Sequence, residues 1–426
     1  MNISVHKFGG ASLSEASLIK NVAEIIRRQS RPAIAVVSAM GKTTNALEKV
    51  VKAKYFNTEN PNDHLNEIKK YHSSIIHHLF ENTSPDKISQ VETAILPYWQ
   101  YAEHLIAQPL TYSYGQLYDQ IVSVGELVSS TIVSEFLNTV EIYNTLKDIR
   151  KILVTDTQWR SANVDISQSQ KNFDEQWLPL IHEQSLILTQ GFIGSTVGGY
   201  TTTLGREGSD YTAALLASFV NAREVTIWKD VEGVLNADPR YFKNPQKIDE
   251  LSYYDAIEMT YYGATVIHPK TIKPLQNKNI PLKVKSFYKP DKEGTIIHQS
   301  ERVQKITTYS YLPNQILISV QSQDYSFITE THIGQIFDII NAFNVKLNLM
   351  QNTALNFSIC TNYDDIITPS FVKELQKHFK VLFNTNVAIL NIRHYTPSIL
   401  NMLVQGKEIL LEQRTRNHVQ LVIREN

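Results

Sequence analysis

Short apolar runs alternate with an amphipathic segment over the first forty residues. Residues 3–8 form an apolar, β-branched run that stops at a glycine pair, and residues 32–39 form a continuous apolar run. Between them, residues 14–29 repeat apolar positions at helical spacing. A strand that is apolar throughout is typical of a sheet covered on both faces. The alternation favours βαβ units and predicts an α/β domain with a mainly parallel sheet.

Residues 43–138 have a mostly helical pattern, and the strand pattern then resumes at residues 185–192. A glycine-rich stretch leads into a helix predicted over residues 209–219 and a strand over residues 224–229. Residues 280–287 are expected to form the last strand of this part of the chain.

The sequence pattern changes near residue 300, where glycine becomes rare and predicted strands and helices alternate over shorter segments. The pattern predicts strand, helix, strand, strand, helix and strand over residues 315–322, 331–343, 345–352, 355–362, 369–379 and 386–395. The order β-α-β-β-α-β is the ferredoxin-like pattern of small ligand-binding modules. A boundary is therefore expected between Pro290 and Tyr311, with one domain over residues 1–295 and a second region over 300–426.

Composition narrows the class of protein. The 426 residues suggest about two or three domains. They are 42% hydrophobic and 19% charged, as in ordinary globular proteins. Lys plus Arg number 41 against 42 for Asp plus Glu, so the chain has no surplus of positive charge for binding nucleic acid.

No apolar run reaches the ~18 residues of a membrane span, and no leader pattern opens the chain. The single cysteine, Cys360, fits a reducing compartment. We expect a cytoplasmic protein that binds neither nucleic acid nor membrane.

The sharpest candidate site lies in TTTLGREGSDYTAALLA (201–217). Gly205 and Gly208 would let the backbone approach a ligand, and a helix that begins near Ser209 and Asp210 would point free N–H groups at an anion. Arg206 offers a planar fork for a carboxylate or a phosphate. The alternative is that Ser209 or Asp210 simply caps the helix.

A second candidate is KFGG (7–10), a glycine pair at the end of the first strand. In α/β folds, ligands bind at the carboxyl edge of the sheet, where this turn would lie. Lys7 would then meet phosphate oxygens. A plain turn with a solvated lysine is the alternative.

SAMGKTTN (38–45) imitates the end of a P-loop but lacks its first glycine, since Val36 stands at that position. Ser38 and Thr44 nevertheless remain candidate ligand contacts, because this turn follows a strand and precedes a helix. Glu126 lies near the start of another helix, where it could serve a ligand or simply favour the first turn.

Asp230 opens a loop that could accept a nucleotide or be a surface turn. His72, His77 and His78 are spaced five and six residues apart, or one residue apart, so they do not share a helical face, and no metal site is expected.

Taken together, the segments resemble aspartate kinases of the amino-acid-kinase superfamily. The resemblance is collinear over roughly residues 1–290 and runs through KFGGAS (7–12), VVSAMGKTTN (36–45), VGELVSS (124–130), TQGFIGS (189–195), TTTLGREGSDYTAALLA (201–217), IWKDVEGVLNADPR (227–240) and YYGATVIHPKT (261–271). The region after residue 300 resembles the ACT regulatory modules of that family. The implied fold is an αβα sandwich with a mainly parallel sheet, followed by an α+β region.

The resemblance also implies roles for residues at matching positions. Lys7, Arg206 and Asp210 would be catalytic. The amino-acid substrate would contact Thr44, Glu126, Arg206, Glu207, Gly208 and Ser209. ATP would contact Lys7, Phe8, Gly9, Gly10, Lys229, Asp230, Leu235, Arg240, Thr265 and Val266.

The implied reaction is transfer of the γ-phosphate of ATP to the β-carboxylate of L-aspartate, the first step toward lysine, threonine and methionine. A carboxylate with a pKa near ~3.9 is already ionised at neutral pH, so no general base is needed. Catalysis would rest on alignment and on neutralisation of phosphate charge by Lys7, the glycine N–H groups and a Mg²⁺ ion carried by ATP.

Some positions depart from the family pattern. Glu207 replaces a usual glycine, Thr265 a frequent lysine and Leu235 a usual aromatic residue. These departures favour one alternative, a catalytically weakened homologue that binds an amino acid or nucleotide and regulates a partner. A kinase for another amino acid such as glutamate is a second alternative, against which the SVGE segment (123–126) and the ACT-like tail argue.

The regulatory region departs further. Asn348 stands where the family usually has aspartate, and Ala354 where it usually has glutamate. An effector such as lysine or threonine would lose charged partners for its ammonium group there. Only 31 residues follow residue 395, so a second ACT module would be truncated or interleaved with the first, with dimerisation through this region expected.

Overall fold

The computed structural model describes residues 2–182, 185–261, 267–300, 306–324 and 326–424. These residues form two compact units. The first comprises the described residues of 2–234, 247–257 and 267–300, and the second those of 235–246, 258–261 and 306–424. The second unit thus takes in two segments that precede residue 295.

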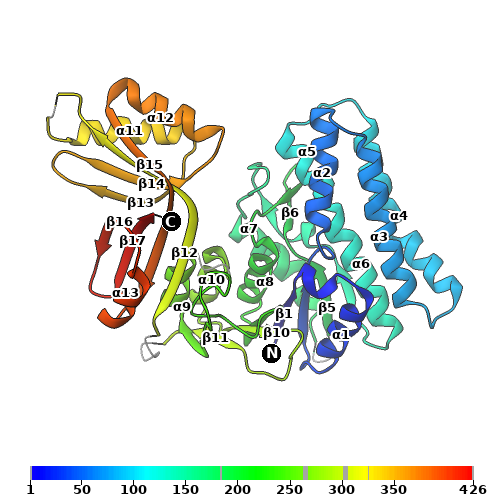
Figure 1. The fold of residues 1–426 in the computed structure, drawn as a ribbon. Helices are drawn as coiled ribbons and strands as arrows, with labels where there is room; N and C mark the ends of the chain where they lie inside the picture. Colours follow the sequence, from blue (N-terminus) through cyan, green and yellow to red (C-terminus); the bar gives the residue numbers. More distant parts are fainter. Residues whose placement is uncertain (1, 183–184, 262–266, 301–305, 325, 425–426) are drawn as a thin grey trace. The chain divides into compact units, whose positions relative to one another are not determined.

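The first unit is built on an eight-stranded sheet with the order β3-β5-β2-β1-β8-β10-β11-β9 (Figure 1). Its strands are β1 (Ser4–Phe8), β2 (Ala33–Val37), β3 (Thr145–Lys147), β5 (Leu186–Gln190), β8 (Glu224–Lys229), β9 (Glu250–Ser252), β10 (Leu282–Ser286) and β11 (Thr295–His298). The strands from β3 to β10 are parallel neighbours. The mainly parallel α/β sheet expected from the sequence is confirmed.

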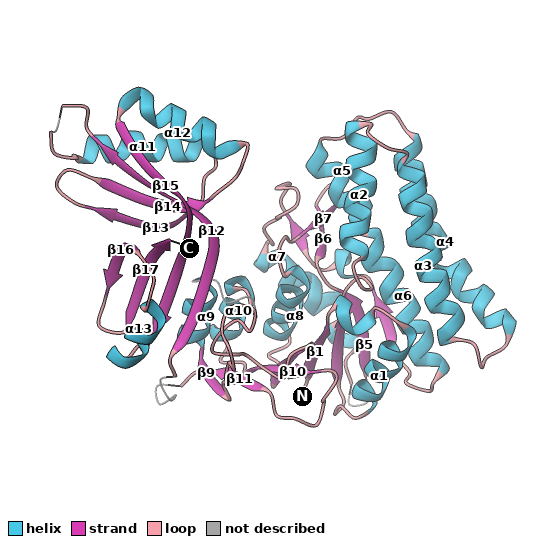
Figure 2. Cartoon of the chain, viewed as in Figure 1, coloured by secondary structure: helices cyan, strands magenta, loops and turns pink. Residues whose placement is uncertain are grey.

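Helices cover both faces of this sheet. Every residue of β1, β2 and β5 is buried, which explains their unbroken apolar sequences. Helix α8 (Gly208–Phe219) packs on β1, β2 and β8, whereas α6 (Val124–Thr139) packs on β2, β3 and β5. Figure 2 shows α8 and α6 on opposite sides of the strands, the αβα arrangement.

The long helical stretch forms an antiparallel assembly beside the sheet. It contains α2 (Thr43–Phe56), α3 (Pro61–Leu79), α4 (Pro85–Ala107) and α5 (Tyr114–Val122), in which α3 contacts α2 and α4. His72 is buried here, with Nδ1 at 2.8 Å from the Ile68 carbonyl oxygen and its ring edge-on to Trp99. This histidine therefore packs in a core.

Several further helices and a small sheet complete the first unit. They are η1 (Gly10–Leu13), α1 (Ala16–Arg27), η2 (Ile149–Lys151), α7 (Ile166–Gln176), η3 (Leu178–Leu180), α10 (Pro269–Gln276) and a small sheet of β4 (Val154–Thr155), β6 (Ile193–Thr196) and β7 (Thr201–Thr203). Helix α9 (Tyr253–Tyr261) follows β9.

The expectation that residues 280–287 hold the last strand of this part was wrong. After β10 the chain turns at Gly294, whose φ of +77° is in the left-handed region, and β11 returns antiparallel to β10. Strand β9 then pairs with β11 in parallel. Both added strands have only three or four residues, too few to show a period.

The second unit contains the predicted β-α-β-β-α-β order. Its elements are β12 (Thr308–Gln321), α11 (Glu330–Ala342), β13 (Leu347–Asn352), β14 (Phe357–Asn362), α12 (Ile367–His378) and β15 (Lys380–Arg393). Strands β12 and β15 are antiparallel over almost their whole length. The two helices pack on an apolar cluster that includes Ile318, Ile336, Ile359 and Phe371.

The chain then extends the same sheet. Helix α13 (Pro397–Val404), β16 (Ile409–Arg414) and β17 (His418–Arg424) follow, and the sheet has the order β13-β14-β12-β15-β17-β16. The first half of β12 and the second half of β15 pack in a separate core with β17 and α13. One pair of long strands therefore serves both halves of the unit. No helix in the described part of the chain is long and apolar enough to cross a membrane.

Candidate active site

A cavity of about 590 Å³ opens in the first unit where β1 and β8 end. Its lining contains Lys7, Gly10, Ser38, Ala39, Gly41, Thr44, Tyr118, Glu126, Arg160, Phe192, Gly205, Arg206, Glu207, Gly208, Ser209, Asp210 and Lys229. The register explains why distant segments meet here, because Lys7 lies beside Val36 of β2 and Ile227 of β8. The carboxyl ends of parallel neighbours share one edge of the sheet.

Two lysines and one aspartate form the charged centre of the cavity. Lys7 Nζ lies 2.6 Å from Asp210 Oδ1, and Lys229 Nζ lies 3.2 Å from Asp210 Oδ2. The side chain of Asp210 is only 1% exposed. One buried carboxylate therefore holds two ammonium groups from neighbouring strands side by side.

The electrostatics keep Asp210 and Lys229 ionised. Burial opposes ionisation of Asp210, but Lys7 and Lys229 outweigh it and hold the pKa of Asp210 below its ordinary value. Burial also acts against the charge of Lys229, yet the carboxylates of Asp210 and Glu207 raise its pKa. The cavity thus presents positive charge at neutral pH.

The glycine turn after β1 lies against the turn after β2. Gly41 N–H donates to the Gly10 carbonyl at 2.9 Å. A Cβ on Gly10 would lie 2.6 Å from the Gly41 carbonyl oxygen and 2.8 Å from that of Ala39. Only glycine fits at residue 10, because both contacts are to backbone atoms that cannot rotate away.

The motif at residues 205–210 opens α8 without the cap that was its alternative explanation. The N-cap residue is Glu207, which makes no capping hydrogen bond through its side chain. Ser209 and Asp210 lie inside the first turn and are buried. Arg206 is exposed in the cavity lining, and among the described residues no hydrogen bond or ion pair involves its guanidinium group. Capping therefore does not account for these residues.

Glu207, the neighbour of Arg206 in the sequence, contacts His268 and Lys229. Its Oε2 accepts a hydrogen bond from the backbone N–H of His268 at 2.9 Å, and its Oε1 lies 3.6 Å from Lys229 Nζ. Burial raises the pKa of Glu207, while Lys229 acts in the opposite direction. The residue holds a left-handed backbone, with φ of +53°, which is unfavourable for a side chain larger than glycine.

Glu126 is a strongly perturbed acid of the cavity. It lies in the first turn of α6, 3% exposed, and its Oε2 makes no hydrogen bond. Burial raises the pKa of Glu126 to about 8, against the smaller opposing effects of the Ala39 backbone and Lys7. A buried carboxylate oxygen that lacks a partner and faces a cavity is suited to bind a cation.

The structure gathers most of the sequence-derived site residues in this cavity, but not all. Phe8 is buried and stacks on Trp228 with ring centroids 6.0 Å apart, and Gly9 precedes η1. Asp230 is exposed and is not part of the lining. Leu235 and Arg240 belong to the second unit, where Arg240 pairs with Asp238. Thr265 and Val266 lie outside the described residues. The nucleotide roles of these seven residues stay predictions.

Four lining side chains were not among the residues predicted from the sequence: Ala39, Tyr118, Arg160 and Phe192. Arg160 lies in an irregular segment between β4 and α7, and Tyr118 lies inside a helix. Neither stands in a short motif beside a glycine turn, so no local signal marked them. Among the described residues, no group of three or more His, Cys, Asp or Glu is arranged to hold a metal ion.

Comparison with known proteins identifies the family. The model of the amino acid kinase family matches residues 2–286. The chain is 30% identical to lysine-sensitive aspartokinase 3 of Escherichia coli over 397 residues, which cover 91% of this chain and 86% of that protein.

Two crystal structures of E. coli aspartokinase III are also similar, each with 26% identity and covering 99% of this chain and 96% of the other. The complex with lysine and aspartate (T-state) superposes with a TM-score of 0.82, and the complex with aspartate and ADP (R-state) with 0.81. The chain belongs to the amino acid kinase family and, within it, to the aspartokinases.

Proposed function

We propose that this chain transfers the γ-phosphate of ATP to the β-carboxylate of L-aspartate, giving 4-phospho-L-aspartate. The proposal rests on one cavity that brings three features together. They are the buried carboxylate of Glu126 with an unpaired oxygen, the guanidinium group of Arg206, which makes no hydrogen bond or ion pair among the described residues, and the two lysines held by Asp210. The relative with 30% identity is an aspartokinase, and a similar structure contains aspartate and ADP.

The amino-acid end of the cavity matches the charges of aspartate. Glu126 would receive the ammonium group, because its buried Oε2 has no other partner. Arg206 would grip the α-carboxylate with its planar fork, since its guanidinium group is exposed in the cavity. Thr44 and Ser209 lie in the same lining.

The phosphate end matches the charge that develops during transfer. Lys7 and Lys229 are held by Asp210 at 2.6 and 3.2 Å, which fixes both ammonium groups before the substrates arrive. Fixed cations in a partly buried site stabilise the transferring phosphoryl group without reorganisation. The acceptor carboxylate is already ionised, so the site needs no general base.

An assay with hydroxylamine tests the proposal, because hydroxylamine traps an acyl phosphate as a hydroxamate. Aspartate should give ATP-dependent hydroxamate, whereas L-glutamate and a reaction without an amino acid should not. The substitution Arg206→Gln should raise the KM for aspartate by roughly 10- to 100-fold, the size of a lost hydrogen bond to a charged group. Arg223→Gln, at an exposed arginine outside the cavity, is the matched control.

The alternative function is that of a weakened homologue that regulates a partner. It predicts ATP binding without turnover of any amino acid. The three charged residues that the reaction needs, Lys7, Arg206 and Asp210, lie in one cavity, and Glu207 is bound to Lys229 and the His268 backbone instead of Arg206. These contacts favour the kinase.

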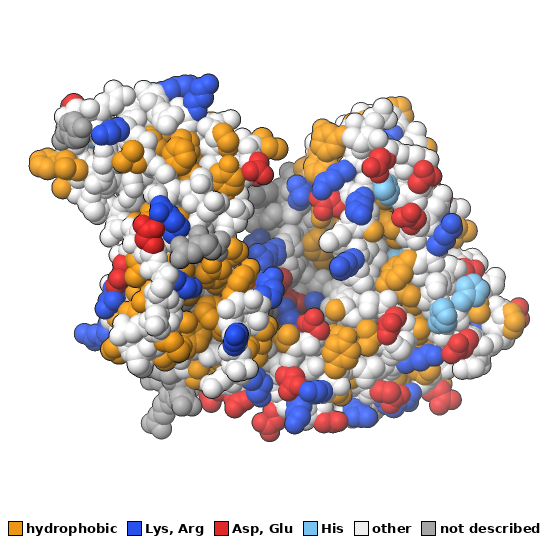
Figure 3. Space-filling model, in the orientation of Figure 1, with side chains coloured by type: hydrophobic (Ala, Val, Ile, Leu, Met, Phe, Trp, Pro, Cys, Tyr) orange, Lys and Arg blue, Asp and Glu red, His pale blue; other side chains and the backbone are white. Residues whose placement is uncertain are grey.

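Further assignments belong to the same proposal. Residues 1–295 would be the catalytic domain, and 300–426 an ACT-like region for regulation and dimerisation with two interleaved modules. Figure 3 shows hydrophobic side chains at the surface of the second unit. In this unit the side chains of Met350, Leu382 and Phe383 are about half exposed. Exposed hydrophobic side chains of this kind are what a dimer interface would require. Mg²⁺ would arrive on ATP. The enzyme would act in the cytoplasm, at the entry to lysine, threonine and methionine synthesis.

A further inference from the structure

A second arginine, Arg160, belongs to the cavity lining. It lies in the segment between β4 and α7. Its guanidinium carbon lies 4.7 Å from the ring centroid of Tyr118 and 5.4 Å from that of Tyr114, both on α5. Stacking on two rings restricts the side chain while leaving the N–H groups at the guanidinium edge able to bind a ligand.

The backbone of Arg160 is held in a conformation that costs energy. Its φ of +69° is left-handed, which is uncommon for a residue with a side chain and persists where the surroundings enforce it. The segment is also close-packed, since a Cβ on Gly205 would lie 3.2 Å from the Arg160 carbonyl oxygen. Gly205 precedes Arg206, so the two arginine-bearing segments contact each other through their backbones.

A buried carboxylate enforces this arrangement. Asp119, fully buried on α5, accepts the Arg160 backbone N–H at 3.1 Å from each oxygen. It also accepts the Thr203 N–H at 3.0 Å and the Thr203 hydroxyl at 2.7 Å. Thr203 ends β7, three residues before Arg206. One side chain thus fixes both arginine-bearing segments at once.

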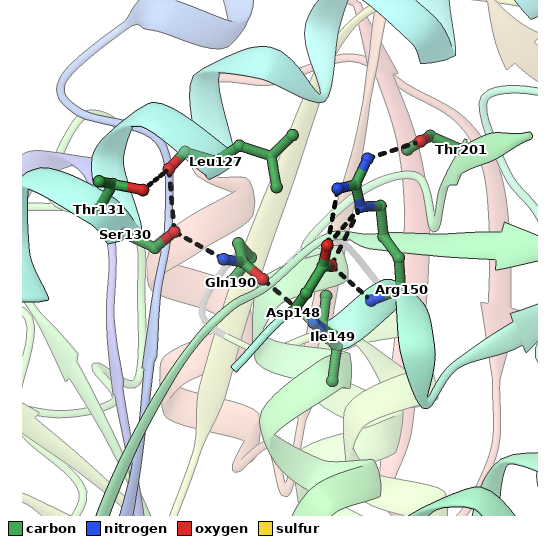
Figure 4. A network of polar contacts seen from close by, with 8 residues as sticks. All are labelled: Leu127, Ser130, Thr131, Asp148, Ile149, Arg150, Gln190 and Thr201. Carbon is green, nitrogen blue, oxygen red and sulfur yellow. Dashed lines mark hydrogen bonds and ion pairs between the residues drawn. The ribbon is translucent and has the colours of Figure 1, made fainter. Parts of the chain in front are cut away.

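The other end of β7 is held as firmly. Thr201 accepts a hydrogen bond at its hydroxyl from Arg150 at 3.2 Å, and its carbonyl accepts one from Gln120 at 2.6 Å. Figure 4 shows Arg150 between Asp148 and Thr201. The strand that leads to Arg206 therefore has little freedom to move away from Arg160.

The alternative to a ligand-binding role for Arg160 is a surface ion pair with Glu48. That pair is weak, because the closest atoms are 3.9 Å apart and both side chains are partly exposed. A surface pair also gives no reason for a left-handed backbone clamped by a buried carboxylate. A ligand that carries a carboxylate supplies the reason.

We infer that Arg160 binds the α-carboxylate of the acceptor together with Arg206, and that Asp119 is the residue that positions it. The inference rests on the proposed function and extends it. Two arginines fixed to adjoining segments would define how far the anchored carboxylate lies from the phosphate end. The site would then discriminate against glutamate, whose side chain is one methylene longer.

Kinetics of Arg160→Gln test the contact. The KM for aspartate should rise about 10- to 100-fold, whereas the KM for ATP should change less than twofold. Arg223→Gln should alter neither. Isoasparagine, the α-amide of aspartate, lacks the charge that Arg160 would bind, so its KM should be nearly the same for the wild type and Arg160→Gln.

The role of Asp119 is tested by a double-mutant cycle. Asp119→Asn should raise the KM for aspartate in both backgrounds, but by a smaller factor in the Arg160→Gln background, because only the Arg206 segment that Asp119 holds through Thr203 is then left to be disturbed. If Asp119→Asn fails to fold, the KM values of Arg160→Gln for aspartate and isoasparagine decide whether Arg160 contacts the α-carboxylate.

The outcomes separate the two proposals. If the wild type forms no hydroxamate from aspartate, the proposed function is wrong. If the wild type is active but Arg160→Gln keeps its KM for aspartate within twofold, the inference about Arg160 is wrong. An equal loss with aspartate and with isoasparagine would also refute a contact to the α-carboxylate.

Discussion

Aspartate binding should depend on pH through Glu126, and the structure sets the size of the effect. Burial raises the pKa of Glu126 to about 8 in the free protein. Pairing with an ammonium group requires the ionised form, which is about half of the protein at pH 8 and about one-tenth at pH 7. The apparent Kd for aspartate rises as the competent fraction falls. It should therefore increase about 25-fold between pH 8.5 and pH 6.5.

Isothermal titration calorimetry measures this linkage directly. At pH 7, each bound aspartate should release about 0.9 proton, seen as an enthalpy that depends on the ionisation enthalpy of the buffer. The pKa of Asp119, raised by burial to about 6, lies below the tested range and adds little. Glu126→Gln should abolish the proton release and flatten the pH profile. Binding without proton release between pH 6.5 and 8.5 would refute the assigned role of Glu126.

Stability offers a second measurement on the same residue. The folded pKa of Glu126 lies above the ordinary value of 4.5, so the native state retains a proton that the unfolded chain loses between pH 4.5 and 8. The free energy of unfolding should therefore fall as pH rises across this range, by up to about 1.4 kcal/mol per pH unit. Glu126→Gln should lack this dependence in urea denaturation, and equal slopes for the two proteins would contradict the shift.

Three further predictions follow from single contacts. Glu207→Gln should lower the KM for ATP severalfold, because it removes a carboxylate that holds Lys229; a higher KM would contradict this. Gly10→Ala should cost about 1–3 kcal/mol of stability and most activity, since its Cβ would collide with two carbonyl oxygens. The control Gly334→Ala, with open space around it, should be neutral or stabilising in thermal denaturation. Lysine should leave hydroxamate formation unchanged at millimolar concentration, because Asn348 offers only an amide, which hydrogen-bonds two neighbouring amides.

Strong periodic segments were predictable from the sequence. The strand at residues 224–229 and the helix at 209–219 match β8 and α8 to within one residue. Their apolar positions are buried on continuous faces, so burial and sequence pattern carry the same information. The strands β9 and β11 were missed because three or four residues cannot display a period.

The cavity residues that belong to short motifs were predictable from the sequence. Lys7 and Arg206 lie beside glycines that end a strand or open a helix, a local signal for a ligand-facing turn. Arg160 stands in no such motif. Its place in the cavity follows from a hydrogen bond to Asp119, 41 residues earlier in the chain.

The sequence by itself determined the alternation of strands and helices, the glycine turns and the kinds of charge available. Only the tertiary structure decided which charges meet. It paired Lys7 with Asp210, turned Glu207 toward Lys229 and buried Glu126 without a partner for one oxygen. The physical reason is that ion pairing and desolvation depend on distances between segments far apart in the chain, which no local pattern encodes.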